Sequence, residues 1–147
     1  MNGLIKHQMQ PCPISCVATC IAMVAGIPAV EAVERFHKRY REDGLSLRKI
    51  LNELGIPFTS FDSADDASLG DEGAYLCTAP SLNIVAGTHE IIIEVTGDDY
   101  FVIDPVMGRE DRKYYVKRGQ ASGLAIDLGG FKIDAFISAD WLKGRPE

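Results

Sequence analysis

Residues 10–28 read QPCPISCVATCIAMVAGIP, and this stretch decides the expected fold. Its two early prolines keep the chain extended, since proline lacks the N–H that a helix needs and restricts the residue before it. From Cys16 to about Ala25 the residues are apolar nearly all round, which predicts a central, buried helix. Ser15 is the expected N-cap of this helix, and the Gly-Ile-Pro that follows should end it.

Two further helices are expected before the pattern changes. Residues 29–40 are amphipathic, and their apolar stripe is formed by four side chains, Val30, Val33, Phe36 and Tyr40. Residues 47–54 repeat apolar side chains at helical spacing after Ser46, and Gly55 closes this third helix.

The rest of the chain favours strands. Candidate strands cover residues 56–61, 74–78, 89–95, 100–103, 113–116 and about 131–137, and an acidic stretch over 62–72 is expected to form a solvated loop. Helices followed by strands indicate an α+β fold in which N-terminal helices pack on a C-terminal antiparallel sheet.

Composition limits the possible functions. The 147 residues are expected to form one domain spanning 1–147, with an ordinary 46% hydrophobic and 24% charged residues. The net charge of -6 argues against a nucleic-acid partner, which would require a basic face. No run approaches the roughly 20 apolar residues of a membrane span, and no basic leader is present, so we expect a cytoplasmic protein.

The four cysteines are expected to be free thiols. Cys16 and Cys20 on one helix would lie about 6 Å apart between Cβ atoms, too far for a relaxed disulfide. Free thiols indicate a reducing compartment. A metal site built from Cys12, Cys16 and Cys20 is an alternative, but the even spacing of four lacks the close pair of a zinc site. We therefore expect no metal and no cofactor.

Cys16 is the candidate nucleophile among them. A thiol becomes strongly nucleophilic as the thiolate, and the N-terminus of a helix lowers the pKa of a thiol placed there. Cys16 falls at the first position of the central helix, whereas Cys20 lies one turn deeper and Cys12 lies before the helix. In the structural alternative all four cysteines are simply small hydrophobic side chains.

A cysteine nucleophile needs a base, and the chain has three histidines. His7 is close to the N-terminus, where chains are often mobile. His37 lies among basic residues on the amphipathic helix, as expected of a solvated face. His89 opens a strand where a loop meets the sheet, a place where catalytic groups are held by a rigid scaffold. We therefore expect His89 to be the base.

Hairpin geometry links His89 to an acid. If Val95 pairs with Tyr100 across the turn at 96–99, the residue numbers of every pair in this antiparallel hairpin add up to 195. Position 89 then lies opposite position 106. Asp104 is then a diagonal neighbour of His89 on the same face of the sheet. A base and its orienting carboxylate must share a face in this way. Asp104-Pro105 can equally initiate a turn, and both roles can hold at once.

Gln10 is the candidate oxyanion donor. Acyl transfer needs donors aimed at the developing negative charge, and a glutamine amide can supply one. Gln10 lies on the extended approach, six residues before Cys16. Gln8 is a weaker candidate for the same role.

Together these residues resemble a known family. Gln10 followed by Cys16-Val-Ala-Thr-Cys-Ile-Ala-Met23 is similar to the signature of the bacteriocin-processing, double-glycine leader peptidases. Gly87-Thr88-His89 with its strand, and Phe101-Val-Ile-Asp104-Pro105, resemble later elements of that family. Its members are papain-like cysteine peptidases, usually found as the N-terminal domain of peptide-exporting ABC transporters.

The resemblance implies roles as well as a fold. Cys16 would be the nucleophile, His89 the general base and later acid, Asp104 the group that orients His89, and Gln10 part of the oxyanion hole. The substrate would be a peptide or protein, and an exporter or an immunity protein is a conceivable partner. The family commonly has Asp before and Gly after the nucleophile, where this chain has Ser15 and Val17, so the double-glycine preference stays open. No membrane or ATPase domain is expected after Glu147.

Two other functions stay open at this stage. Papain-like folds also support glutamine deamidation and acyl transfer, as in bacterial effector toxins, and such a protein could be exported by a non-classical route. The last alternative is a catalytically silent peptide-binding module.

Overall fold

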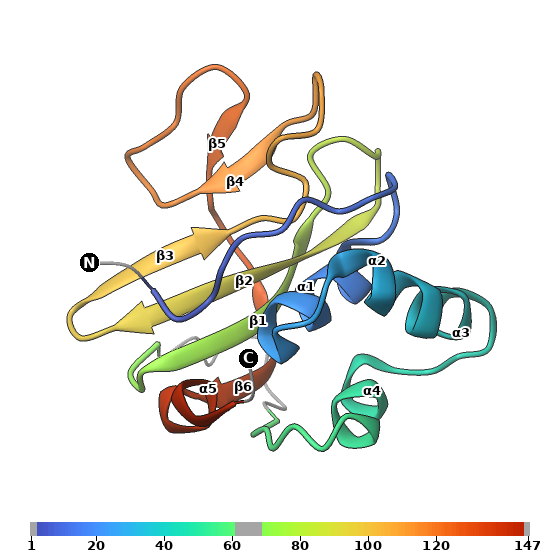
Figure 1. The fold of residues 1–147 in the computed structure, drawn as a ribbon. Coiled ribbons are helices and arrows are strands. Elements are labelled where there is room, and N and C mark those ends of the chain that lie inside the picture. The colour runs from blue at the N-terminus through green and yellow to red at the C-terminus, as the bar shows by residue number, and fades with distance from the viewer. Residues whose placement is uncertain (1–2, 61–68, 146–147) are drawn as a thin grey trace.

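A computed structural model describes residues 3–60 and 69–145 of the chain (Figure 1). The helices are α1 (Cys16–Ala25), α2 (Ala29–Ala32), a π-helical stretch (Val33–His37), α3 (Lys38–Glu42), α4 (Leu47–Glu53) and α5 (Ala139–Gly144). The strands are β1 (Gly73–Pro80), β2 (Thr88–Thr96), β3 (Asp99–Ile103), β4 (Tyr114–Val116), β5 (Ala125–Asp127) and β6 (Lys132–Ser138).

Four of the strands form one antiparallel sheet in the order β3-β2-β1-β6. The α+β plan with N-terminal helices and an antiparallel sheet is therefore confirmed. The sequence did not predict β5, α5 or the short parallel pair β4–β5, which lies beyond the edge strand β3 and away from α1 (Figure 1). The expected strand at 56–61 is reduced to one bridge between Thr59 and Phe136, and residues 61–68 of the expected strand and loop lie outside the described residues.

Both faces of the sheet are covered. Helix α1 packs on one face, where its apolar side chains meet Leu76 and Ile92. On the other face Ile91 and Ile93 pack with Tyr115 and neighbouring apolar side chains. Successive residues of a strand point to opposite faces, so a strand segment covered on both sides favours apolar residues at consecutive positions. This explains the unbroken isoleucine run in β2.

Helix α1 has the expected bounds and is buried from Val17 to Val24. It ends at Gly26, whose left-handed backbone (φ 76°) lets its N–H donate to the carbonyl of Ala22. Ser15 occupies the N-cap position as expected, but its side chain makes no capping hydrogen bond.

The apolar stripe predicted for residues 29–40 is partly wrong. Phe36 is fully buried as expected, but Val30 is 59% exposed and Tyr40 is 36% exposed. Ala29 and Ala32 are the buried residues of the first turn instead. The helix widens to π geometry at Val33–His37, and an inserted π-turn shifts the buried face relative to a regular 3.6-residue repeat.

The N-terminal segment is fixed to the rest of the molecule. The buried carboxylate of Glu94 in β2 accepts the backbone N–H groups of Leu4 (2.5 Å) and Ile5 (3.0 Å). Arg145 donates to the carbonyl of Leu4 at 2.7 Å. His7, expected near a mobile terminus, instead has its Nε2 2.9 Å from the backbone oxygen of Asp104. The segment therefore reaches residue 10 along a defined path.

Glu94→Ala is expected to lower the free energy of unfolding by about 1–3 kcal/mol, because two buried N–H groups lose their acceptor. Urea denaturation monitored by circular dichroism measures this. Asp98→Asn, at an exposed turn residue, is the control and should change stability little. Equal stability of the two variants would show that Glu94 does not hold the N-terminal segment.

Candidate active site

Cys16 lies at the start of α1 with unsatisfied backbone donors around it. The hydroxyl of Ser15 accepts the N–H of Cys12 (3.2 Å) and lies 3.0 Å from the carbonyl of Cys12, so it closes a turn instead of capping the helix. The first backbone bond of the helix runs from Thr19 to Ser15. The N–H groups before Thr19 have no helical carbonyl to bond, as at any helix start. They are available to stabilise negative charge.

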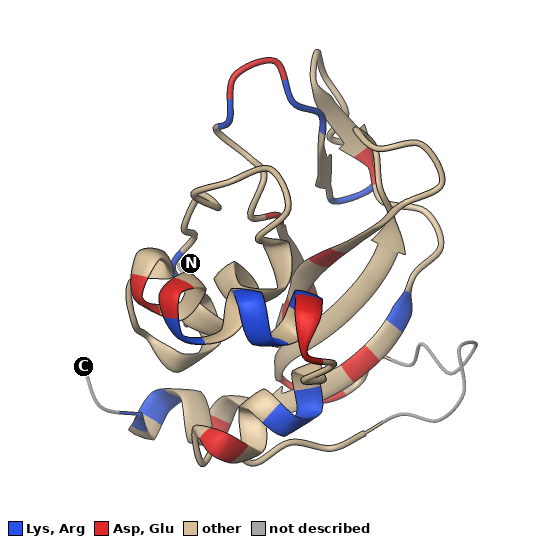
Figure 2. Ribbon diagram, turned by 90° about the vertical axis from the view of Figure 1, so that its right-hand side faces the viewer, with Lys and Arg blue, Asp and Glu red and all other residues tan. Residues whose placement is uncertain are grey.

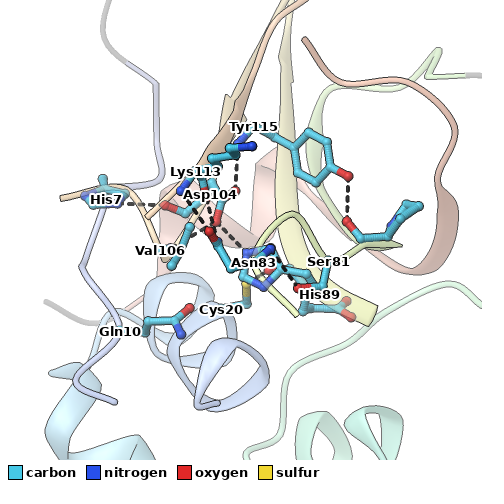
Figure 3. Close-up of polar contacts among 12 residues, drawn as sticks. His7, Gln10, Cys20, Ser81, Asn83, His89, Asp104, Val106, Lys113 and Tyr115 are labelled. Carbon is cyan, nitrogen blue, oxygen red and sulfur yellow. Dashed lines mark hydrogen bonds and ion pairs between the residues drawn. The ribbon is translucent and has the colours of Figure 1, made fainter. Parts of the chain in front are cut away.

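His89 and Asp104 meet as the hairpin arithmetic predicts. Val95 pairs with Tyr100 and Ile92 with Ile103, so paired positions sum to 195. The Nε2 of His89 lies 2.6 Å from Oδ1 of Asp104 (Figure 3). The two side chains share a face of the sheet, and this part of the prediction is confirmed.

Asp104 is held by more than His89. Its side chain is 1% exposed, and its two oxygens accept the backbone N–H groups of Val106 (2.9 Å) and Tyr115 (2.8 Å) (Figure 3). Three donors therefore satisfy a buried carboxylate, the condition under which such a charge is tolerated. No sequence pattern indicates this role for Tyr115, because the role depends on where β4 folds.

The imidazole of His89 connects this acid to the thiol of Cys16. Cys16 and His89 line one pocket and each shifts the pKa of the other. Since Nε2 of His89 faces Asp104, Nδ1 is the nitrogen that can face sulfur. Burial alone would lower the pKa of His89, but the hydrogen bonds and charges of Asp104 and Cys16 outweigh burial and raise that pKa to about 9.

The pKa of the Cys16 thiol shifts in the opposite direction, downward. Burial alone would raise the pKa of Cys16, but the hydrogen bond and the positive charge of His89 outweigh it. The backbone N–H groups of Glu90 and Val17 also lower it, and the pKa falls below its ordinary value. A Cys16 thiolate paired with a His89 imidazolium is the state that these shifts favour.

Cys20 and Cys77 lie in a different environment. Cys20 is fully buried with its sulfur 3.4 Å from the carbonyl of Glu90, and burial raises its pKa well above the ordinary value. Burial likewise raises the pKa of Cys77. All four cysteines are free. Among the described residues, no group of three or more His, Cys, Asp or Glu side chains is arranged to hold a metal ion.

Glu90 is a buried acid that the sequence analysis overlooked. Its side chain shares a polar cluster with Asp134 through the hydroxyl of Thr78, which lies 2.6 Å from Asp134 and 3.2 Å from Glu90. Burial first, and then the charge of Asp134, raise the pKa of Glu90 well above its ordinary value. A protonated Glu90 adds no negative charge next to the Cys16 thiolate.

Gln10 and Gln8 have different surroundings. Gln10 lines the same pocket as Cys16 and His89, and its Nε2 donates one hydrogen to the carbonyl of Cys12 (2.9 Å), leaving the second hydrogen of the amide. Gln8 instead bonds the connection between α1 and α2, donating to the carbonyl of Ile27 (2.8 Å) and accepting the N–H of Ala29, the first residue of α2 (2.7 Å). Only Gln10 is therefore placed with Cys16 in one pocket.

The loop at 81–87 sets the position of His89 at the start of β2. Ser81 donates its N–H to Gly87 (2.9 Å) and accepts the N–H groups of Asn83 and Ile84 through its hydroxyl. Asn83 exchanges two hydrogen bonds with the backbone of Lys113, at 2.9 and 3.0 Å (Figure 3). These contacts connect the loop before β2 to the segment that leads into β4.

Comparison with known proteins leaves the chain without an assigned family. No protein-family model, no curated protein and no solved structure matches it. Within the described ranges, no helix has the length and hydrophobicity needed to cross a membrane.

We predict that Cys16 is the fastest thiol to react with iodoacetamide at neutral pH, because its pKa is lowered while those of Cys20 and Cys77 are raised. Peptide mapping after limiting alkylation identifies the labelled cysteine. His89→Ala should move the pH midpoint of Cys16 alkylation upward, since the cation that stabilises the thiolate is lost. First labelling of Cys12, or an unchanged midpoint in His89→Ala, would contradict the assignment.

Proposed function

We propose that this protein is a papain-like cysteine peptidase that cleaves a peptide bond through an acyl-enzyme on Cys16. The observation that carries the proposal is the position of His89, which lines one pocket with Cys16 and lies 2.6 Å from Asp104. A thiol, an imidazole and a buried carboxylate in that order form a nucleophile, a base and an orienting group.

The reaction follows from these positions. The Cys16 thiolate attacks the substrate carbonyl carbon, and the carbonyl oxygen takes up the negative charge. The helix-start N–H groups and the second amide hydrogen of Gln10 are the donors for that oxyanion. The C–N bond then breaks as the imidazolium of His89 gives its proton to the leaving amine. Water, deprotonated by His89, hydrolyses the thioester to release the acid and restore the thiol.

Asp104 has a positioning role in this scheme. Since Val106, Tyr115 and His89 all donate to it, its carboxylate has one orientation, and the imidazole is held with Nδ1 toward sulfur. Its negative charge also stabilises the imidazolium that pairs with the thiolate.

The setting of the enzyme is part of the proposal. Four free thiols suit a reducing compartment, so we place the protein in the cytoplasm. The resemblance to double-glycine leader peptidases favours a peptide substrate, and leader-peptide processing is the finer form of the hypothesis.

The test is incubation with a mixed peptide library, read by mass spectrometry, with wild type compared with Cys16→Ala. Peptidase action shortens peptides, whereas glutamine deamidation leaves them whole and adds about one dalton. We expect shortened peptides with wild type and none with Cys16→Ala. Deamidated but uncut peptides, or no Cys16-dependent change, would reject the peptidase proposal.

The same assay tests the triad. His89→Ala should reduce kcat/KM by about 10³-fold or more, and His89→Ala with Asp104→Ala should be little worse, since groups acting as a unit are not additive. Asp104→Asn, which keeps one acceptor oxygen, should be milder than Asp104→Ala. Thermal unfolding checks that each variant is folded. Independent, multiplicative losses would show that Asp104 does not act through His89.

Gln10→Ala should lower kcat by about 10²–10³-fold with a smaller change in KM, the expected loss of one oxyanion donor. Gln8→Ala is the matched control. It should reduce stability, because Gln8 joins Ile27 to Ala29, while turnover by the folded fraction is kept. The opposite pattern would assign the oxyanion donor to Gln8.

A further inference from the structure

We propose that the pocket beside Cys16 binds an acidic side chain of the substrate, one or two residues from the bond that is attacked. The inference deepens the proposed function and rests on it, because the bound side chain belongs to a substrate only if the protein is the proposed peptidase. The evidence is the charge of the pocket, which three arginines share with Cys16 and His89: Arg41, Arg109 and Arg112. None of the described residues that line the pocket is Asp or Glu.

These arginines are set apart from others nearby. Arg35 and Arg39, on the same helical stretch as Arg41, pair with Glu31 and Glu53. In the described part of the chain, Arg41 and the two other pocket arginines have no carboxylate within ion-pair distance. In a protein of net charge -6, three unpaired cations in one pocket indicate a binding function.

The fold directs two of them to this place. A run of backbone hydrogen bonds folds the segment after β3 into successive turns, joining Met107 to Asp104, Arg109 to Val106 and Arg112 to Arg109. Figure 2 shows this segment as a loop on which an acidic stretch (red) lies between basic ones (blue). Those acids, Glu110 and Asp111, are exposed and are not among the lining residues.

Arg109 has a second task in the pocket. Its Nη1 donates to the backbone carbonyl of Gln10 at 3.1 Å, which ties the turn to the segment that carries the candidate oxyanion donor. Arg41 and Arg112 are exposed, and neither side chain donates a hydrogen bond within the described residues. Their guanidinium groups are the ones available to a ligand.

The chemistry of arginine selects the ligand. A guanidinium presents a planar fork of donors that matches a carboxylate. An extended peptide advances about 3.3–3.6 Å per residue, so a side chain held in the same pocket as the thiol belongs to a residue close to the attacked carbonyl. The substrate is therefore expected to carry Asp or Glu next to, or one residue beyond, the cleaved bond.

The first test does not depend on peptide cleavage. The measured quantity is the rate of Cys16 alkylation by iodoacetate, which is anionic, divided by the rate with iodoacetamide, which is neutral. Because both reagents react with the same thiolate, changes in thiol nucleophilicity cancel in this ratio. Arg41→Gln and Arg112→Gln should each lower this ratio about two- to fivefold, the range for partly exposed charge pairs. Arg118→Gln, an equal charge change outside the pocket, should not. Equal ratios in all four proteins would overturn the inference.

The second test uses matched peptides that carry Glu or Gln at each position around the cleaved bond. We expect Glu at one position to raise kcat/KM about tenfold over Gln, and Arg41→Gln and Arg112→Gln to reduce that preference. Cleavage without any acidic preference overturns this inference and leaves the peptidase proposal standing. If amidation of the peptide C-terminus abolishes the preference, the pocket binds a terminal carboxylate. That result would overturn the proposal that it binds an acidic side chain. Without any cleavage the peptidase proposal fails, and the alkylation ratio alone decides whether the pocket is anion-binding.

Discussion

Asp104 joins four separate parts of the chain, three of them through its buried carboxylate. Its oxygens accept from His89 in β2, from Val106 in the following turn and from Tyr115 in β4, while its backbone carbonyl meets His7 of the N-terminal segment. A buried charge is stable only when its hydrogen-bonding capacity is satisfied, so His89, Val106 and Tyr115 must be in place together. The short parallel pair β4–β5, remote from the thiol, is in this way coupled to the geometry of the site.

The pKa of Cys16 depends on the groups around the Asp104 carboxylate. The charge of Asp104 favours the imidazolium of His89, and the imidazolium favours the thiolate. A charged Glu90 would oppose the thiolate, because the charges of Glu90 and Cys16 act on each other. Burial next to Asp134 prevents this by raising the pKa of Glu90. The two buried acids thus differ in their surroundings, because three donors contact Asp104, whereas burial and the charge of Asp134 raise the pKa of Glu90.

The sequence predicted what periodicity and local geometry determine. The bounds of α1, the pairing of β2 with β3 and the meeting of His89 with Asp104 follow from apolar patterning and from a turn that sets the register. The sequence did not predict features that depend on competing hydrogen-bond partners or on contacts between residues far apart in the chain. Ser15 had two possible partners, and its hydroxyl bonds to Cys12 instead of capping the helix. A π-turn moved the buried face of the second helix, and no local pattern marks Tyr115 as a donor to Asp104.

The charges of the pocket also explain how an acidic group can approach a thiolate at all. Cys16, His89 and Asp104 together carry a charge of about -1 in their reactive state, and the whole chain carries -6. At physiological ionic strength, charges more than about 8 Å apart are largely screened, so the distant acidic surface matters less than the groups lining the pocket. There the cations outnumber the anions, and an incoming carboxylate meets net attraction. Without Arg41 and Arg112, only Arg109 of the three pocket arginines would offset the net charge of about -1 on Cys16, His89 and Asp104. These two arginines are therefore the residues that we propose admit an acidic substrate.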